Sequence, residues 1–423
     1  MALEQYQSDM ETCCRCSACK FIPLEKVKSC QPINICPSIT YNDFHAYSGG
    51  GRMGIGVAIL ENRLEYTDKL LDVVYNCMTC GGCDISCKYA MDMEVLQPIL
   101  ETRIRCVENG HTLPALDRII ASLRTQGHMV PGTKIKRGDW LEGKEVKDYT
   151  SEKCEVIFHA GCRTCYNKDM WKVAQNTVDL LQKAGVDIGV AGDNESCCGG
   201  RAHEMGYKED AVRQAEKNMA VYKKAGVKTL VTGCADCYHA FKILYDEFGL
   251  KGDLEVLHTT EYFARLIGEG KLKPDKTVNM TVTYHDPCHL GRLGEPYIRW
   301  EGRQIPGHIR IFDPPKEFRR GTYGIYEPPR EILRSIPGVK LIEMQRIKEY
   351  AWCCGAGGGV TESNPEFAAF TAGERIREAE NTGAEAVVSA CSGCETNFSE
   401  SINERGSRLK VYDVVELLHD AVT

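Results

Sequence analysis

The sequence predicts an α+α/β fold, in which a helical N-terminal domain precedes two duplicated α/β domains. Short β-branched runs alternate with helical stretches after residue 153, as is typical of layered α/β domains. The same order of sequence features occurs twice in residues 153–423. Residues 1–130 lack such regularly spaced β-branched runs, which indicates that they form helices instead.

The N-terminal domain is expected to span residues 1–130. The stretches KLLDVVYNCMTC and MEVLQPILETRIRCVENG are interpreted as helices. The next stretch, VPGTKIKRGDWLEGKEVKDYTSEK, contains Pro, Gly and many charged residues. Residues 131–152 are therefore predicted to form a linker.

The two α/β domains are expected at residues 153–275 and 276–423. Buried parallel strands are predicted at CEVIFHA, TLVTGC, MTVTYHD and AVVSAC. The helical stretches between them, such as MWKVAQNTVDLLQKAG, end in Gly after a polar or basic last turn. Ligands gather at the carboxyl ends of strands in such sheets, and Cys162, Cys234, Cys288 and Cys391 fall there.

Composition excludes several classes of protein. The net charge of −7 argues against general nucleic-acid binding, which requires a basic face. No apolar run approaches the roughly 18 residues of a membrane-spanning helix. The start, MALEQYQSDMETCC, lacks the features of a secretory signal, so we expect a cytoplasmic protein that reaches a membrane only through a partner.

The 23 cysteines are the outlier in this composition. In a reducing cytosol such a count indicates metal ligands rather than disulfides. Adjacent cysteines, as in ESCCGG and WCCGAGGG, are also poor disulfide partners.

The first block of cysteines predicts two [4Fe-4S] cubanes. Cys77, Cys80, Cys83 and Cys87 have the bacterial ferredoxin spacing, and Cys13, Cys16 and Cys19 repeat its first half. The usual Cys-Pro follows an insertion, at Cys36. Because the fourth cysteine of such a motif reaches the neighbouring cluster, the predicted ligand sets are Cys13, Cys16, Cys19 and Cys87 for one cubane, and Cys77, Cys80, Cys83 and Cys36 for the other.

Some alternatives stay open in this block. Four-cysteine zinc sites also use Cys-x2-Cys pairs, although two successive x2 spacings are rare in them. Cys30 competes with Cys36 as a ligand, and the proline after Cys36 favours Cys36. Cys14 and Cys106 are interpreted as spectators.

Each α/β copy supplies five thiols. The first set is Cys162, Cys197, Cys198, Cys234 and Cys237, and the second set is Cys288, Cys353, Cys354, Cys391 and Cys394. The gap from the paired cysteines to the last pair is 35 residues in copy one and 36 in copy two. Copy two also carries an insertion, placed at about residues 294–327.

Five thiolates exceed the four that a cubane needs, so an unusual cluster with bridging sulfurs is expected. The side chains of adjacent cysteines can bind two neighbouring metal ions. The glycines after them let backbone N–H groups approach an anionic cluster, and a helix that starts there adds its positive end.

This pattern resembles the cysteine-rich CCG domain of heterodisulfide reductases. Two copies behind a two-cubane, ferredoxin-like domain resemble the D subunit of that enzyme, over nearly the whole chain. The same layout occurs in the C subunit of anaerobic glycerol-3-phosphate dehydrogenase and in the D subunit of the tungsten-dependent benzoyl-CoA reductase complex. The insertions at residues 20–35 and 294–327 resemble the latter group more than a methanogen enzyme.

The resemblance implies two Rossmann-like CCG domains, each holding a non-cubane [4Fe-4S] cluster on its complete five-cysteine set. It further implies that a substrate disulfide is cleaved between two such clusters. The simpler alternative is that these cysteines only pack as small buried residues. Cys165 and Cys154 have no matched counterpart and are interpreted as non-ligands.

His159 and His285 occupy matching positions, three residues before the first cysteine of each set. They are either proton donors or histidines that hydrogen-bond the backbone at a strand end, and the second interpretation is preferred. The copy-two insertion has a local excess of positive charge. It is interpreted as a site for an acidic thiol cofactor, a docking site for a partner, or a solvated loop.

Two functions follow as hypotheses. In the first, the cubanes feed the special clusters, which reduce a disulfide one electron at a time. In the second, the chain only relays electrons between a flavoprotein or quinone-reactive partner and another catalytic subunit. Since the sequence lacks a flavin or nicotinamide fingerprint, electrons must come from a partner, expected to be a flavoprotein, iron–sulfur or cytochrome subunit.

Overall fold

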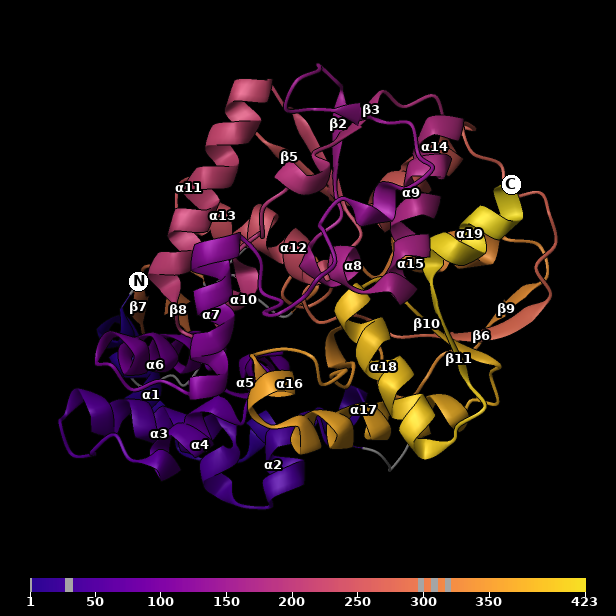
Figure 1. Cartoon of the computed structure of the whole chain (residues 1–423). Helices are drawn as coiled ribbons and strands as arrows, with labels where there is room; N and C mark the ends of the chain where they lie inside the picture. The colour runs from indigo at the N-terminus through magenta and orange to yellow at the C-terminus, as the bar shows by residue number, and fades with distance from the viewer. Residues whose placement is uncertain (1, 27–32, 296–299, 306–310, 316–320) are drawn as a thin grey trace.

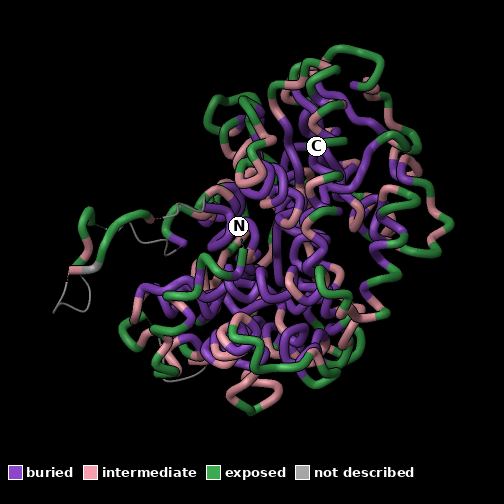
Figure 2. The backbone as a smooth tube through the Cα atoms, turned by 90° about the vertical axis from the view of Figure 1, so that its left-hand side faces the viewer, coloured by how far each residue is buried: buried purple, intermediate pink, exposed green. Residues whose placement is uncertain are grey.

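The computed structural model describes residues 2–26, 33–295, 300–305, 311–315 and 321–423. Helices and parallel sheets are combined, as the sequence predicts. Figure 1 shows the N-terminal helices below a first sheet, with a second sheet beside them. Figure 2 shows that buried backbone runs through the middle of the molecule and joins these parts.

The described residues before Lys147 form helices and one isolated β-bridge, between Phe21 and Asn34. Helix α4 starts where the Thr67 hydroxyl accepts a hydrogen bond from the Leu70 N–H at 3.2 Å. Helix α7 begins at Pro114 and ends before Gly127, whose φ of 74° closes the helix in the left-handed region. The helices are α1 (Gln7–Thr12), α2 (Pro37–Asn42), α3 (Gly49–Leu60), α4 (Asp68–Tyr75), α5 (Gly82–Ala90), α6 (Leu96–Glu108) and α7 (Pro114–Gln126).

The first α/β domain contains a five-stranded parallel sheet with the order β1-β3-β2-β4-β5. Its strands are β1 (Lys147–Asp148), β2 (Val156–His159), β3 (Ile188–Val190), β4 (Thr229–Thr232) and β5 (Glu255–His258). Its helices are α8 (Cys162–Tyr166), α9 (Trp171–Lys183), α10 (Gly200–Glu204), α11 (Lys208–Ala225), α12 (Ala235–His239), α13 (Tyr245–Glu247) and α14 (Thr259–Gly268), with a π-helical turn at Ala240–Leu244.

The second α/β domain contains a four-stranded parallel sheet with the order β11-β10-β6-β9. Its strands are β6 (Met280–Tyr284), β9 (Val339–Leu341), β10 (Ala386–Ser389) and β11 (Lys410–Asp413). Its helices are α15 (Glu327–Ser335), α16 (Val360–Ser363), α17 (Pro365–Glu380), α18 (Ser392–Arg405) and α19 (Val414–Val422).

The two sheets repeat one strand order, because β3-β2-β4-β5 corresponds to β9-β6-β10-β11. The last strand of each domain also ends in the same way. His258, the last residue of β5, and Asp413, the last residue of β11, each cap the following helix, and Glu261 or Glu416 accepts a bond from the backbone N–H of that capping residue. The domains pack through helices, with α9 against α19 and α14 against α15 (Figure 1).

The segment predicted as a linker takes part in the first domain. Lys147–Asp148 form β1 and extend the sheet beside β3. Trp140 is buried and packs edge-on against Phe158 of β2, with the ring centroids 6.0 Å apart. Burial of one large aromatic ring fixes this polar stretch to the core.

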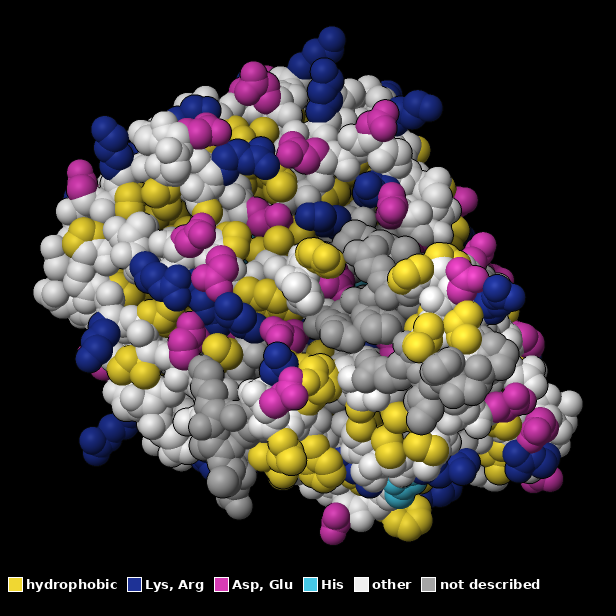
Figure 3. Space-filling model, turned by 180° about the vertical axis from the view of Figure 1, so that it is seen from behind, with side chains coloured by type: hydrophobic (Ala, Val, Ile, Leu, Met, Phe, Trp, Pro, Cys, Tyr) yellow, Lys and Arg dark blue, Asp and Glu magenta, His cyan; other side chains and the backbone are white. Residues whose placement is uncertain are grey.

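The copy-two insertion lies partly outside the described residues. Its described part includes an antiparallel pair, β7 (Arg303–Gln304) and β8 (Phe312–Asp313). Seen from behind, the Lys and Arg of the described residues are interspersed with Asp and Glu (Figure 3). The basic residues that give the insertion its predicted positive charge, apart from Arg303, lie outside the described residues. Within the described ranges, every helix is too short or too polar to cross a bilayer.

Arg103 of α6 links the three parts of the chain. Its guanidinium is fully buried and donates to the Cys77 carbonyl at 2.7 Å. The same guanidinium donates to the carbonyls of Glu204 and Gly358, each at 2.9 Å. One side chain thus satisfies buried carbonyls in the helical part and in both α/β domains.

Arg103→Met is expected to lower the free energy of unfolding by about 3 kcal/mol, because three buried carbonyls lose their donor. Urea unfolding followed by circular dichroism measures this loss. Arg105→Met, two residues along the same helix, is the matched control. Arg105 is part-exposed and pairs with Glu4, so its loss is expected to stay below about 1 kcal/mol. Equal losses for the two variants would contradict the role of Arg103.

Candidate metal centres

The first set of five cysteines gathers at the carboxyl end of the first sheet. Cys162 follows β2 and opens α8, and Cys234 follows β4 and caps α12. Cys197 and Cys198 lie in the turn before α10, and Cys237 lies within α12. Four of the five are buried and Cys162 is half-buried.

The second set repeats this placement. Cys288 follows β6, and Cys391 follows β10 and caps α18, which contains Cys394. Cys353 and Cys354 lie in the loop before α16. Four of these five are also buried, and Cys288 is half-buried. The structure therefore brings each predicted set together at a sheet edge.

The glycine after each cysteine pair has a specific role. The Gly199 N–H donates to the Cys197 sulfur at 3.4 Å, and the Gly355 N–H donates to the Cys353 sulfur at the same distance. Both glycines have positive φ, 78° and 92°. A Cβ on Gly355 would lie 2.6 Å from the Ala368 carbonyl oxygen, so no other residue fits this turn.

The two sets form one continuous row of interacting thiols. In the first set the contacts run through Cys162, Cys197, Cys198, Cys237 and Cys234, and in the second set through Cys391, Cys394, Cys354, Cys353 and Cys288. The sets meet at a hydrogen bond between Cys234 and Cys391. Hydrogen bonds from Cys197 and Cys237 lower the pKa of Cys198 to about 5.

The cysteines of the helical part also separate into two neighbourhoods. Burial raises the pKa of Cys36 to about 12, and the charges of Cys77 and Cys80 contribute. Burial raises the pKa of Cys87 as well, with contributions from Asp84, Cys19 and Cys13. Cys36 is thus close to the second motif, and Cys87 is close to the first. Cys16 is exposed, whereas Cys30 lies outside the described residues.

One cysteine of the helical part reaches the α/β domains. A hydrogen bond from Cys353 lowers the pKa of Cys80 to about 6. Nearby, the fully buried Arg292 donates to the Cys80 carbonyl at 2.7 Å. The second set is therefore in direct contact with the second N-terminal motif, and Cys197 of the first set packs in the same buried cluster as Cys19 and Cys87.

A cavity of about 450 Å³ lies beside the first set and is lined by all five of its cysteines. Ile119, Met129 and Val130 form an apolar wall. Arg163 and Arg201 line it too, and both bond to Glu362 of the second domain. Burial opposes the charge of Glu362, but the two guanidinium groups lower its pKa to about 2.

Arg137 is a neighbour of the first set that no sequence pattern singled out. It belongs to the segment predicted as a linker, and its side chain is buried. Both terminal nitrogens lie 3.6 Å from the Cys162 sulfur, and one of them donates to Glu195 at 2.8 Å. A permanent positive charge thus touches a thiol of the first set.

His289, which follows Cys288 directly, was also missed. Its Nε2 pairs with Glu204 at 2.6 Å and its Nδ1 with Asp236 at 3.1 Å. Burial opposes protonation, but Glu204, Cys288 and Asp236 raise the pKa of His289 well above its usual value. This imidazolium joins the second domain to two carboxylates of the first. In the sequence, the position of His289 directly after the predicted ligand Cys288 was the one feature that could have indicated a role at the site.

The cysteines interpreted as spectators or non-ligands are not members of this row of thiols. Cys14 is exposed, and Cys154 is half-buried near Asp187. Cys106 is buried among apolar side chains of the helical part. Cys165 is buried, with its sulfur 3.9 Å from a Glu195 oxygen, and it lies close to the predicted ligand Cys162.

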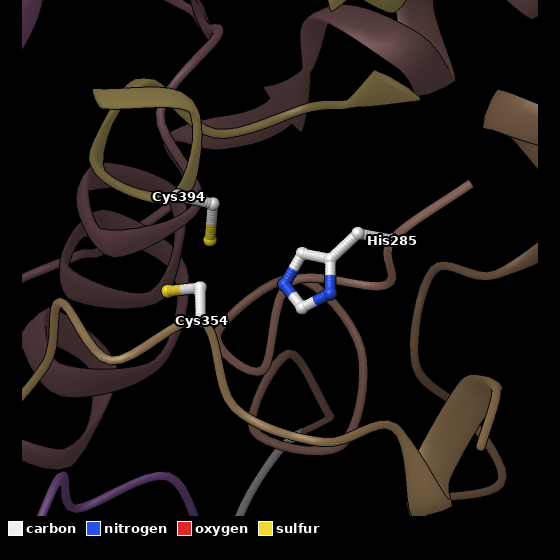
Figure 4. Close-up of side chains that lie close together, drawn as sticks. All are labelled: His285, Cys354 and Cys394. Atoms are coloured by element: carbon white, nitrogen blue, oxygen red, sulfur yellow. The ribbon is translucent and has the colours of Figure 1, made fainter. Parts of the chain in front are cut away.

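His285, Cys354 and Cys394 form a tight buried group in the second domain. Their ligating atoms lie within 4.8 Å of one another. Figure 4 shows a ring nitrogen of His285 facing the two sulfurs. His159, the matching histidine of the first domain, lies 3.7 Å from Glu195 instead.

A family described as the cysteine-rich domain, CCG, matches residues 156–242 and 282–399. The chain is also 30% identical to the D subunit of the dihydromethanophenazine:CoB–CoM heterodisulfide reductase of Methanosarcina mazei, over 98% of this chain and 94% of the relative. The chain belongs to the family of heterodisulfide reductase D subunits. This confirms the resemblance to heterodisulfide reductase, whereas the resemblance to the benzoyl-CoA reductase complex stays a prediction. The chain is an iron–sulfur oxidoreductase subunit of the heterodisulfide reductase type.

Two longer relatives come from bacteria. A probable iron–sulfur-binding oxidoreductase of Bacillus subtilis, FadF, is 30% identical over 85% of this chain and 49% of the relative. An EtfAB:quinone oxidoreductase of Syntrophomonas wolfei is 28% identical over 86% of this chain and 48% of the relative. A hypothetical protein from Helicobacter pylori shares the fold, with a TM-score of 0.52 and 10% identity over 88% of this chain and 67% of that protein.

Gly355→Ala is expected to destabilise the protein by about 2–3 kcal/mol, through strain at positive φ and the clash with the Ala368 carbonyl. Gly226→Ala is the control, because Gly226 has a φ of 71° and open space around it, so only about 1 kcal/mol is expected. The free energy of unfolding in urea measures both. A loss for Gly355→Ala no larger than that for Gly226→Ala would show that the turn tolerates a side chain.

Proposed function

We propose that the chain carries electrons from an N-terminal pair of cubanes to two non-cubane four-iron clusters and reduces a disulfide at the cavity beside the first set. The observation that carries this proposal is the row of thiols. It begins at Cys80, passes through the second set, crosses at Cys234–Cys391 and ends in the cavity.

The donor sets fit these groups. Soft thiolates are the preferred ligands of iron–sulfur clusters, and burial keeps water away from them. The proposed cubane ligands are Cys13, Cys16, Cys19 and Cys87, and Cys77, Cys80, Cys83 and Cys36. The proposed non-cubane ligands are the two five-cysteine sets, which the duplicated α/β domains, 153–275 and 276–423, would supply. Cys36 is close to the second motif and Cys87 is close to the first, which supports this assignment of the cubane ligands.

Surrounding groups compensate the charge of the proposed sites. Buried thiolates are unfavourable without positive neighbours or hydrogen-bond donors. Arg137 donates toward Cys162, and the Gly199 and Gly355 amides donate to Cys197 and Cys353. These donors are fixed by the fold, so they favour the anionic form of the sulfurs.

The chemistry at the cavity requires two electrons and two protons, since RSSR + 2e⁻ + 2H⁺ gives 2 RSH. Iron–sulfur clusters supply single electrons, so the succession of sites suits this stoichiometry. The cavity volume of about 450 Å³ suits a small molecule. The apolar wall of Ile119, Met129 and Val130 would exclude water from the reacting sulfurs.

The cavity favours an anionic disulfide or thiol. The Arg201 Nε is buried without a hydrogen-bond partner among the described residues. Arg163 is partly exposed and holds Glu362 only at 3.5 Å. These guanidinium donors match a carboxylate, sulfonate or phosphate on the substrate.

A pure electron relay is the second candidate. The similarity to an EtfAB:quinone oxidoreductase favours it, because that name joins a flavoprotein to a quinone. In this case the chain, as a cytoplasmic subunit, would pass electrons between a partner flavoprotein or quinone site and another catalytic subunit, benzoyl-CoA reductase being one example. The cavity would then have no substrate.

Iron analysis and turnover on the same preparation separate these possibilities. We expect about 16 Fe per chain, with about four lost in Cys162→Ala and in Cys288→Ala. Cys154→Ala, a cysteine of the first α/β domain outside the row, should keep its iron. About 8 Fe, unchanged in the first two variants, would contradict the special clusters.

Turnover is measured as disulfide-dependent oxidation of reduced viologen, two per disulfide. Full iron content without this activity, together with co-purification of a flavoprotein, would favour the relay.

Arg201→Gln is expected to raise KM for an anionic disulfide about 10–100-fold, because a charge-assisted bond worth about 1.5–3 kcal/mol is lost. The KM for a neutral disulfide should stay unchanged. Arg265→Gln, a part-exposed arginine that lines no part of this cavity, is the control. Equal effects on anionic and neutral disulfides would refute anion recognition by Arg201.

A further inference from the structure

His285 lies against the second set. Its hydrogen bond with Arg375 is compatible with only one tautomer of the neutral imidazole ring. The Arg375 Nε donates to the His285 Nδ1 at 3.1 Å. Arginine has donors and no acceptor, so Nδ1 must accept this bond with its lone pair. The neutral ring therefore carries its proton on Nε2.

The Nε2 proton faces the sulfurs. Nε2 is buried and has no nitrogen or oxygen partner among the described residues, and the ring lies within 4.8 Å of the Cys354 and Cys394 sulfurs, with Cys354 in hydrogen-bonding contact with it. Figure 4 shows that the ring nitrogen nearest Cys354 is the one remote from the side-chain attachment. An N–H group with no other partner thus points at two proposed ligands.

We propose that His285 is a positioning residue that donates its Nε2–H to sulfur at the second set and thereby raises the reduction potential of the cluster held there. This inference rests on the proposed function, because it requires that cluster. It assigns His285 a role as hydrogen-bond donor rather than metal ligand, since the lone pair needed for iron is absent from a protonated Nε2.

The surroundings hold this arrangement in place. Arg375 is fully buried, and its Nη1 donates to the Arg346 carbonyl and to Glu378, each at 2.8 Å. The Phe398 ring meets the His285 ring edge-on at 4.9 Å. With its charge and position fixed, the guanidinium keeps the His285 tautomer from switching.

The effect on potential has a definite sign. Reduction adds negative charge to the cluster and its sulfurs, and a hydrogen bond to sulfur stabilises the more negative state. Removing the donor therefore disfavours reduction. Hydrogen bonds to the sulfurs are one of the ways in which a protein sets such potentials.

The first domain offers a matched control. His159 occupies the equivalent position and meets Phe241 edge-on at 4.7 Å. Its Nδ1 lies 3.7 Å from a Glu195 oxygen rather than against a guanidinium. The tautomer of His159 is therefore not fixed by an arginine as that of His285 is.

The test is an EPR redox titration of His285→Leu and His159→Leu beside the unchanged protein. In His285→Leu, the ratio of reduced to oxidised cluster for one non-cubane signal should fall about tenfold at a fixed potential, which is a shift of 59 mV for a one-electron couple. His159→Leu should leave that signal in place. An unchanged titration in His285→Leu, at full iron content, would overturn the inference.

Spectroscopy of the unchanged protein gives a second measurement that does not depend on a variant folding. With ¹⁵N-labelled histidine and exchange into D₂O, the reduced cluster should show one weakly coupled, exchangeable N–H proton. Strong ¹⁵N coupling would identify His285 as a ligand and refute the donor role. Absence of any non-cubane signal, with about 8 Fe per chain, would instead refute the proposed function.

Discussion

Burial of many sulfur groups in a small volume is the constraint on which the rest of the structure depends. A thiolate loses most of its hydration in such a place and needs fixed donors or positive charge in return. The interior supplies both, as buried arginines at 103, 137, 292 and 375 and as glycine amides beside the paired cysteines. Charged and polar groups therefore lie beside these sulfurs, within an interior that is otherwise largely apolar.

The two α/β domains share a backbone plan but not their surroundings. Both place thiols at strand ends, and both use a left-handed glycine after the cysteine pair. The first set faces Arg137 and a cavity, whereas the second faces His285, Arg292 and the N-terminal Cys80. Two thiol sets with the same local backbone geometry can therefore have different chemical properties, because the residues around each set come from different parts of the chain.

Local pattern predicted the combination of helices with parallel sheets and the grouping of thiols at the ends of strands. Strands such as Val156–His159 and Ala386–Ser389 were identified because β-branched runs end at cysteines. Strand β1 was missed, because Lys147–Asp148 is short and polar and is fixed only by pairing with β3. The contact between Cys234 and Cys391, and the role of Arg137, depend on how distant segments pack, and spacing along a chain carries no such information.

The contact between Cys234 and Cys391 joins equivalent positions of the two domains. The helices at the domain interface also pair reciprocally. Helix α9 of the first domain packs against α19 of the second, and α14 of the first packs against α15 of the second. Reciprocal contacts of this kind are those of a twofold-symmetric dimer, in which one surface binds its own copy. The domain interface thus has the form of a twofold-symmetric dimer interface within one polypeptide. Because the two halves are one chain, they need not be identical, so each half has its own neighbours while the sulfurs still meet at equivalent positions.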